Sequence, residues 1–409
     1  MRRQMAAIAT IAILVATIAS AASSTVIIES EGRVQEQALA LRAAEVNPQN
    51  DRIIAVGEEG YAILLSSNNP TDSTIMRVLS TEYNVTLNSV SWHSGGRTAF
   101  LAGDSGIVLR YAESDHGVEL VEGTGALEST DINAISWRNN GDRAYLGGED
   151  GRIYSYDAEN GFQLLDTAQS GSGITSISCH RHHSLCIVTT IEDGVAIIDR
   201  DSQVHWLGKT DNTWLDSICS DEDVNECIII ASGRRISALL LKPDDAGSSI
   251  IEEEVVIGEL SGEFIGISGF RDNSVVIFMA PYSIIQYDLD SRQSYRMLEH
   301  EDVKDAELAL SSTNIIHIWG EDERNGHTIS SDGTVAEFSP PLSQESDLMT
   351  KGMIVLVAIA VPGSIFGLFF MNSKTLQGWY YSRRNAKRQK AKDRAKQLEK
   401  KQAADKKKQ

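Results

Sequence analysis

Three stretches of this chain align with one another without a gap, and this repetition limits the folds that the chain can adopt. They are VNPQNDRIIAVGEEG from Val46, WHSGGRTAFLAGDSG from Trp92 and WRNNGDRAYLGGEDG from Trp137. Each carries a glycine 11 residues after its start and another 14 residues after it, and the starts lie 46 and 45 residues apart. A period of this length is typical of repeated units that cannot bury their faces alone.

The third stretch and its flanks predict four short strands. INAISW alternates apolar and polar residues as a half-buried strand does, and RNNGD supplies the positive φ of a tight turn. RAYLGG, RIYSYD and GFQLLD predict three further strands, with GEDG as a second turn. Four strands in each repeat are typical of β-propeller blades.

Weaker copies follow and bring the total to seven. They begin at Cys179, Cys219, Gly269 and about Ala309, so the starts step by 46, 45, 42, 40, 50 and 40 residues. The sequence therefore predicts an all-β, seven-bladed propeller over residues 24–342.

The last blade lacks a strand that the N-terminal end can supply. ISSDGTVAEFS (Ile329–Ser339) matches the second turn and third strand of a blade, but Pro340 and Pro341 follow, which exclude a fourth strand. TVIIES (Thr25–Ser30) is a strand without a blade of its own. Pairing it with the last blade would close the ring and remove an open edge.

Both ends of the chain predict export and a membrane anchor. Residues 1–23 have two arginines, a short apolar core and small residues at Ala19 and Ala21, as in a secretory signal peptide; an uncleaved anchor is the alternative. After a linker over 343–351, residues 352–371 contain no charged residue for 20 positions, the length of a membrane-spanning helix.

The residues after this span indicate its orientation. Trp379, Tyr380 and Tyr381 are of the kind found at a membrane interface, and the basic tail over 372–409 has 14 Lys and Arg against three acids from Lys374 onward. Positive charge marks the cytoplasmic side, so we expect a single-pass type I protein of the cell membrane with an extracellular propeller. The tail is either an orientation signal alone or a site for anionic lipid, ribosome or nucleic acid.

Charge divides the chain in the same way. Removing the net +11 of the tail, and Arg2, Arg3 and Lys351, from the total of −20 leaves −34 for the predicted exported part. Such an acidic surface repels nucleic acid and suits a salty exterior, although an ordinary soluble surface also explains it.

Four cysteines and three histidines lie in the predicted exported part. Cys179 and Cys186 flank the first turn of blade four, and Cys219 and Cys227 that of blade five, so each pair is predicted to form a disulfide; free thiols or bridges between blades are the alternatives. His180, His182 and His183 lie between the first two cysteines. Zinc needs four convergent ligands, so we favour an exposed polar turn and expect no metal here.

The turns between second and third strands are acidic in most copies. Besides Glu321, Asp322 and Asp332, the candidate binding-face residues are Glu58, Glu59, Asp104, Glu149, Asp150, Glu192 and Asp193. A ring of carboxylates could attract a cation, a basic peptide or a calcium-bridged glycan, although acidic residues also suit exposed turns.

Two further motifs suggest a modification and a contact between helices. Asn84 begins the only N-glycosylation acceptor, in the loop before blade two. Gly363 and Gly367 form a small-xxx-small motif in the predicted span, which could support a homodimer.

The runs SWRNNGDRAYLGGEDGRIYSYD and SWHSGGRTAFLAGDSGIVLRY resemble WD-repeat-like and related bacterial and archaeal propellers. The resemblance covers Val46 to about Ser339, but no blade has the Gly-His opening or Trp-Asp ending of true WD repeats. It implies a rigid binding platform, although this fold has many functions.

Three classes of function follow. The first is a membrane-anchored surface protein whose propeller binds an extracellular protein or glycan, without cofactor or catalysis. The second is a propeller enzyme of the quinoprotein or sialidase kind, disfavoured because basic residues are sparse and no nucleophile, base and stabiliser assemble. The third is a scaffold that acts through its basic tail.

Overall fold

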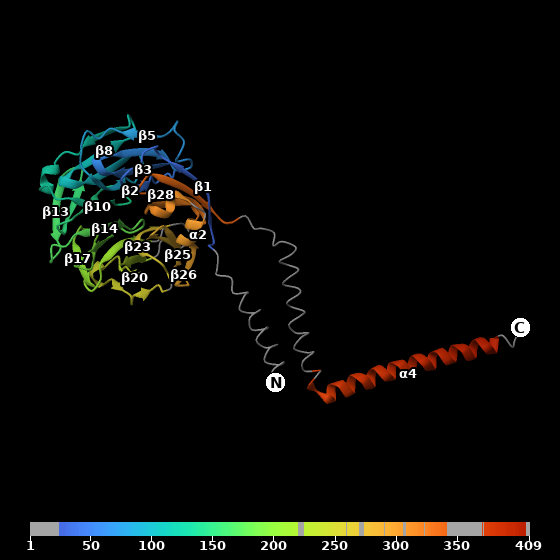
Figure 1. Ribbon diagram of the computed structural model, residues 1–409. Helices are drawn as coiled ribbons and strands as arrows, with labels where there is room; N and C mark the ends of the chain where they lie inside the picture. The colour runs from blue at the N-terminus through green and yellow to red at the C-terminus, as the bar shows by residue number, and fades with distance from the viewer. Residues whose placement is uncertain are drawn as a thin grey trace. The chain divides into compact units, whose positions relative to one another are not determined.

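The computed structural model describes residues 24–219, 225–258, 260–269, 274–289, 291–305, 308–322, 324–341, 370 and 372–405. Contacts divide the chain into two compact units, and Ser24–Pro341 form one of them. The described residues of this unit form seven antiparallel sheets, the blades of a propeller. In each blade the strands are called A to D from the centre outward. Figure 1 shows the chain passing around the ring from blue to orange.

Blades 1 to 4 follow the predicted repeats closely. Blade 1 contains β2 (Leu41–Val46), β3 (Arg52–Gly57), β4 (Ala62–Ser66) and β5 (Arg77–Leu79), and blade 2 contains β6 (Leu87–Trp92), β7 (Thr98–Gly103), β8 (Val108–Ala112) and β9 (Gly117–Leu120). Blade 3 contains β10 (Ile132–Trp137), β11 (Ala144–Gly148), β12 (Arg152–Asp157) and β13 (Gly161–Thr167), and blade 4 contains β14 (Ile174–Cys179), β15 (Cys186–Thr190), β16 (Val195–Ile198) and β17 (Val204–Gly208).

Blades 5 to 7 are less regular. Blade 5 contains β18 (Trp214–Cys219), β19 (Glu226–Ala231) and β20 (Arg235–Leu240), and β20 pairs with both β21 (Ile250–Ile251) and β22 (Val255–Val256). Blade 6 contains β23 (Glu263–Gly269), β24 (Ser274–Ala280), β25 (Ser283–Asp288) and β26 (Gln293–Leu298). Blade 7 contains β27 (Ile315–Asp322), β28 (Asn325–Ser330), β29 (Thr334–Ser339) and β1 (Ile27–Arg33).

The ring is closed by the two ends of the propeller, as the sequence predicts. Strand β1 pairs antiparallel with β29, from Ile27 opposite Ser339 to Arg33 opposite Thr334. The strand runs three residues further than the predicted Thr25–Ser30. Val26, just before it, is fully buried in the core between blades 6 and 7. The seven-bladed architecture and its closure are therefore confirmed.

The seventh repeat begins later than the sequence predicts. Gly320 on β27 faces Gly326 on β28, as Trp137 faces Ala144 in blade 3. Gly320 is therefore the first residue of the seventh repeat, 11 residues after Ala309, where the sequence predicts it. The physical reason is an insertion after blade 6, where helix α2 (His300–Asp305) and the 3-10 helix η5 (Ala309–Ser312) fill the loop before β27.

The two repeated glycines have separate structural causes. At Gly57 and Gly103 the backbone approaches the preceding loop so closely that a Cβ would lie 2.3 Å from Ala40 O and 2.0 Å from Thr86 O. Gly60 and its equivalents lie in the next turn with positive φ, which is +70° at Gly60 itself. The packing of a blade against the loop beside it therefore requires the first glycine, and the turn requires the second.

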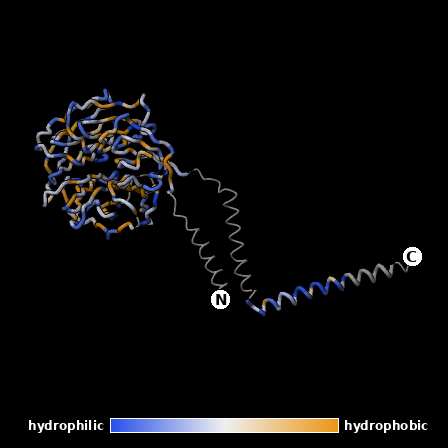
Figure 2. Tube along the Cα trace, in the orientation of Figure 1, coloured by the Kyte–Doolittle hydropathy of each residue, from blue (hydrophilic) through white to orange (hydrophobic). Residues whose placement is uncertain are grey.

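The apolar residues form cores at the seams between neighbouring blades. Ile54 of blade 1, for example, shares a buried cluster with Leu87 and Leu101 of blade 2. Figure 2 shows hydrophobic segments throughout the propeller interior. The A strands contact their neighbours all the way around the centre, so their ends surround the axis of the ring.

Candidate functional site

The loops of the propeller lie at two ends. The turns between strands B and C and the loops that lead into the next blade are at one end, called here the B–C end, and the remaining turns are at the A–B end. In blade 7, Ile27 and Ser339 pair at the A–B end, and Arg33 and Thr334 pair at the B–C end. The chain therefore enters and leaves the propeller at the A–B end.

The acidic turns of the first four blades lie together at the B–C end. They contain all seven candidate residues, Glu58, Glu59, Asp104, Glu149, Asp150, Glu192 and Asp193. Asp332 is in the B–C turn of blade 7, but the grouping of Glu321 and Asp322 with them was wrong. These two residues end β27 and lead into the A–B turn, because the seventh repeat is displaced.

Two of these carboxylates are bound by the innermost strands. Arg42 Nη2 donates to Glu58 Oε1 at 2.6 Å, and Asn88 Nδ2 donates to Asp104 Oδ1 at 2.8 Å. Both donors occupy the same position of strand A in neighbouring blades. The B–C turns of blades 1 and 2 are thus tied to the centre of the ring.

Asp193 is held by the loop that enters its own blade. Although partial burial opposes it, hydrogen bonds from Ser170 and Ser172 hold the pKa of the Asp193 carboxyl below its usual value. In the part of the chain that the structure describes, no three His, Cys or acidic residues gather as a metal site would require. The turn carboxylates therefore act here as local hydrogen-bond acceptors.

A ring of equivalent residues surrounds the B–C end of the A strands, and we call it the mouth ring. In every blade the register between strands A and B shifts around one residue near the start of strand A, the second residue in six blades and the third in blade 6, which is a β-bulge. Its members are Arg42, Asn88, Asn133, Thr175, Leu215, Ile265 and Ile316. Bulges at such places commonly redirect side chains beside binding sites.

The mouth ring has two chemically different halves. Blades 1 to 4 contribute an arginine, two asparagines and a threonine, whereas blades 5 to 7 contribute a leucine and two isoleucines. Ile265 is 37% exposed, and Ile191 in the B–C turn of blade 4 is 42% exposed. This end therefore offers hydrogen-bonding groups on one side and apolar surface on the other.

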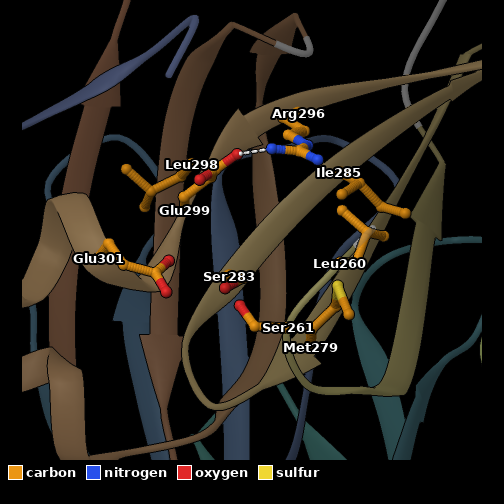
Figure 3. Close-up of a pocket in the computed structure, with 9 residues that line it drawn as sticks. All are labelled: Leu260, Ser261, Met279, Ser283, Ile285, Arg296, Leu298, Glu299 and Glu301. Carbon is orange, nitrogen blue, oxygen red and sulfur yellow. Dashed lines mark hydrogen bonds and ion pairs between the residues drawn. The ribbon is translucent and has the colours of Figure 1, made fainter. Parts of the chain in front are cut away.

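A small pocket opens at the B–C end of blade 6 (Figure 3). Its volume is about 190 Å³, and it is lined by Leu260, Ser261, Met279, Ser283, Ile285, Arg296, Leu298, Glu299 and Glu301. Arg296 Nη1 lies 2.6 Å from Glu299 Oε1 at its edge. Its lining mixes four apolar side chains with two serines and three charged residues, which suits a ligand with both apolar and polar groups.

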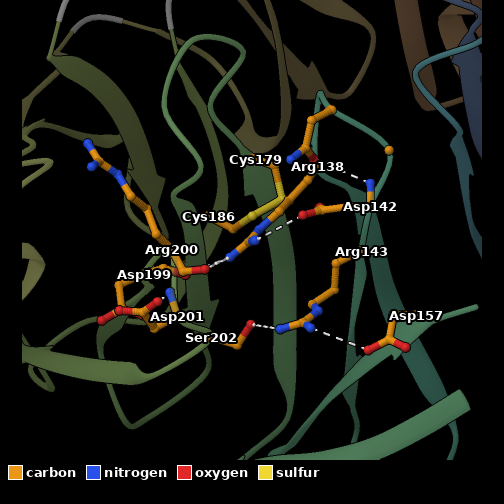
Figure 4. A network of polar contacts seen from close by, with 12 residues as sticks. Arg138, Asp142, Arg143, Asp157, Cys179, Cys186, Asp199, Arg200, Asp201 and Ser202 are labelled. Atoms are coloured by element: carbon orange, nitrogen blue, oxygen red, sulfur yellow. Dashed lines mark hydrogen bonds and ion pairs between the residues drawn. A yellow bond between two sulfur atoms is a disulfide. The ribbon is translucent and has the colours of Figure 1, made fainter. Parts of the chain in front are cut away.

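The A–B end between blades 3 and 4 contains a polar network that joins the two blades (Figure 4). The buried guanidinium of Arg138 donates to the main-chain oxygens of Asp199 and Arg200 at 2.7 and 2.8 Å. Arg143 contacts Asp157 at 3.3 Å and donates to Ser202. The bonds of Arg138, and that of Arg143 to Ser202, join blades 3 and 4, whereas the contact between Arg143 and Asp157 lies within blade 3, so the network is structural.

The structure contains both disulfides within blades, with the pairing that the sequence favours. Cys179 is bonded to Cys186 and Cys219 to Cys227, and the described residues include no free cysteine. Each bond joins the residues that face one another at the A–B end of strands A and B. A zinc site at the histidines of blade 4 would need the thiolates of Cys179 and Cys186, and the disulfide leaves neither thiolate for a metal.

The three histidines of blade 4 form a local turn instead of an open polar loop. His180 is only 1% exposed, and its Nδ1 accepts hydrogen bonds from the main-chain N–H groups of His182 and His183. The expectation of an exposed turn was therefore wrong for His180, because its ring is needed as an internal acceptor.

The glycosylation motif lies on the B–C end. Asn84 is exposed in the loop between blades 1 and 2, where the neighbouring Val85 O accepts a hydrogen bond from Gly60 N. A modified Asn84 would therefore stand beside the mouth ring.

The C-terminal unit is described from residue 370 onward, apart from Met371. It forms the long helix α4 (Lys374–Asp405), whose described part is mostly hydrophilic (Figure 2). No helix among the described residues has the length and apolar character needed to cross a membrane. The predicted signal peptide, all of the predicted span except Phe370, and Gly363 and Gly367 lie outside the described residues.

Comparisons with known proteins agree on the fold. No family model matches the chain, and no curated protein matches it. Among solved structures, the β-propeller domain of Cps50 (Swd1) from Myceliophteria thermophila matches at 12% identity and a TM-score of 0.55, covering 77% of this chain and 99% of the other. YCF48 bound to D1 peptide matches at 11% identity and a TM-score of 0.56, covering 76% of this chain and 97% of the other. The chain therefore has a WD-repeat-like propeller fold.

The mouth ring and the pocket were not found from the sequence. The ring does have a signal, because each of its members stands four residues before the last residue of the repeated first-strand motif, as Asn133 does before Trp137. The pocket has none, since its residues come from three strands, two loops and helix α2.

Proposed function

We propose that this chain is an exported, membrane-anchored binding protein that takes up a peptide segment of an extracellular partner at the B–C end. The main support is the pairing of Ile27 with Ser339, which brings both connections of the propeller to the A–B end. A C-terminal anchor over residues 352–371 would then leave the B–C end accessible to a partner.

The chemistry of the B–C end supports a peptide ligand. The polar half of the mouth ring can bind a peptide backbone, and Leu215, Ile265 and Ile316 can contact its apolar side chains. YCF48, a structure of similar fold, is bound to a peptide. A glycan would instead require polar and aromatic groups over most of the site, so we place it second.

The two disulfides support an oxidising compartment, and the native lysines allow its test. Lys209, Lys242 and Lys304 are exposed on the propeller, and Lys387 and Lys390 are exposed on α4. A membrane-impermeant amine reagent on intact cells should label the first three and label the other two only after lysis. Labelling of α4 in intact cells, or none of the propeller, would contradict this topology.

Site-specific crosslinking tests which end binds. A photoreactive residue at Ile265 should capture a peptide-bearing partner in intact cells, whereas one at Asn140, exposed at the A–B end, should not. Replacing Leu215 and Ile316 by serine should remove the Ile265 crosslink while leaving the folded propeller intact. Equal capture from both positions would refute a specific B–C site, and loss of capture after deglycosylation of the partner would favour a glycan.

A further inference from the structure

Helix α4 has one strongly basic face. Arg383, Lys387, Lys390 and Arg394 follow one another at spacings of four, three and four residues, and all four are exposed. With 3.6 residues in each turn, this spacing places them in one row along the helix. A second row, Arg384, Arg388 and Lys392, lies roughly a third of a turn around the helix.

A third row in the same turns has no positive charge. Ser382, Asn385 and Gln389 follow one another at spacings of three and four residues. They form a row roughly a third of a turn away from Lys387 and Lys390. The basic charge of residues 383–394 therefore lies on two of three rows, although orientation of a membrane protein requires only charge and not its placement.

Aromatic residues precede the basic row on its own face. Trp379 and Tyr380 stand four and three residues before Arg383 and are 58% and 48% exposed. The Arg383 guanidinium lies 4.9 Å from the centre of the Trp379 ring. Tyr380 packs edge-on against Phe370, near the end of the apolar run of the sequence.

We propose that this face of α4 binds a lipid surface that carries anionic phosphate headgroups. Exposed aromatic rings at the start of the helix suit the level of the headgroups, and the basic row that follows can contact their phosphates. The helix begins three residues after the apolar run ends at Met371, which favours a membrane over a distant RNA. The inference rests on the proposed membrane anchor and deepens the role of the basic tail.

The test uses the full-length protein in nanodiscs of phosphatidylcholine, with or without phosphatidylglycerol. Co-elution with neutral nanodiscs reports the anchor by itself. Tryptic cleavage after Arg384, Arg388 and Arg394, followed by mass spectrometry, reports the accessibility of α4, and cleavage after Lys209 in the propeller controls for trypsin activity. We expect anionic nanodiscs to slow cleavage of α4 at low salt, and high salt to restore it.

A matched variant separates the basic face from net charge. Lys387→Gln and Lys390→Gln combined with Asn385→Lys and Gln389→Lys keep the charge and move two lysines to the row that has no positive charge. Protection should fall by up to roughly fivefold for each relocated residue, the factor expected for one basic group near an anionic surface.

Three outcomes would overturn the inference. They are equal cleavage of α4 in neutral and anionic nanodiscs, full protection of the relocated variant, and protection by a single-stranded RNA in neutral nanodiscs with none from phosphatidylglycerol. Failure of the protein to enter neutral nanodiscs would instead refute the anchor, so the two failures are distinguishable.

Discussion

The indole Nε1 of Trp92 donates a hydrogen bond to the main-chain oxygen of Glu45 at 2.9 Å and so ties blade 2 to blade 1. A second hydrogen bond joins the same two residues, because the main-chain N–H of Trp92 donates to Glu45 Oε2 at 2.9 Å. Trp137 occupies the equivalent position in blade 3, but its buried Nε1 has no partner among the described residues. The indole N–H thus joins two blades in one repeat, whereas in the next the ring contacts blade 2 through His93 and Phe100 without that hydrogen bond.

This difference predicts unequal effects of one substitution. Trp92→Phe should lower the free energy of unfolding by about 1 kcal/mol more than Trp137→Phe, because only the first removes a hydrogen bond between blades. Both variants keep an aromatic ring beside the neighbours of the tryptophan, which are Tyr111 for Trp92 and His93, Phe100 and Tyr156 for Trp137. Urea unfolding of the two proteins measures the difference, and equal losses would show that the contact with Glu45 adds nothing.

Glu45 predicts a loss of stability with rising pH. Burial raises the pKa of its carboxyl to about 8, although hydrogen bonds from Trp92 and Ser91 oppose the shift. Between its ordinary pKa, near 4.5, and about 8, the unfolded chain releases this proton before the folded chain does, so the free energy of unfolding falls as pH rises. Glu45→Gln should flatten this slope in urea unfolding from pH 5 to 8. Parallel slopes for wild type and variant would contradict it.

His317 predicts the opposite slope in acid. Burial lowers the pKa of its imidazole to about 4, so below its ordinary value of 6.5 the unfolded chain binds a proton that the folded chain excludes. Stability should therefore fall as pH decreases from about 6.5 to about 4. His317→Gln should reduce the fall, as thermal unfolding at pH 7 and pH 4.5 can measure. If the variant and wild type lost the same amount, carboxylates elsewhere would account for the acid sensitivity.

The disulfides replace an aromatic contact of the other repeats. Trp137 faces Ala144, and that alanine faces Tyr156; in blade 4 the same three positions hold Cys179, Cys186 and Ile198. Changing both cysteines to alanine should lower the free energy of unfolding by about 2 to 3 kcal/mol, because the bond closes only a short loop.

Reduction provides the control for this prediction. Dithiothreitol should lower the midpoint of urea unfolding of the wild type and leave a variant without any of the four cysteines unchanged. A wild type insensitive to reduction would show that neither bond stabilises the propeller.

The sequence revealed the fold because each blade repeats local rules. One copy already shows the alternation in INAISW, the turn in RNNGD and the two spaced glycines. The number of copies along the chain then gives the number of blades. The start of the seventh repeat was missed because α2 and η5 lengthen the loop before Ile315, and a constant period cannot anticipate an insertion.

Much less of the candidate site was predictable. The acidic turns could be located because a turn is specified by residues that are adjacent in the sequence. Whether the Asp193 carboxylate can bind a ligand, however, depends on Ser170 in the preceding loop, which already donates a hydrogen bond to it. The mouth ring depends on a bulge in each A strand and on the meeting of seven strands around one axis. The spacing of residues in the sequence predicts neither feature. Its two halves became apparent only when Asn133 and Ile265 were seen to hold the same place in different blades.

Removal of strand β1 should open the ring. A propeller beginning at Val34 lacks the partner of β29 and loses Val26, which is fully buried between blades 6 and 7. The exposed edge of β29 can then pair with other chains, so we expect a lower urea midpoint and aggregation at micromolar concentration. The control is a propeller beginning at Ser24, which keeps the strand and should remain monomeric by light scattering. If the shorter protein unfolded at the same urea concentration and stayed monomeric, β1 would not be the closing strand in solution.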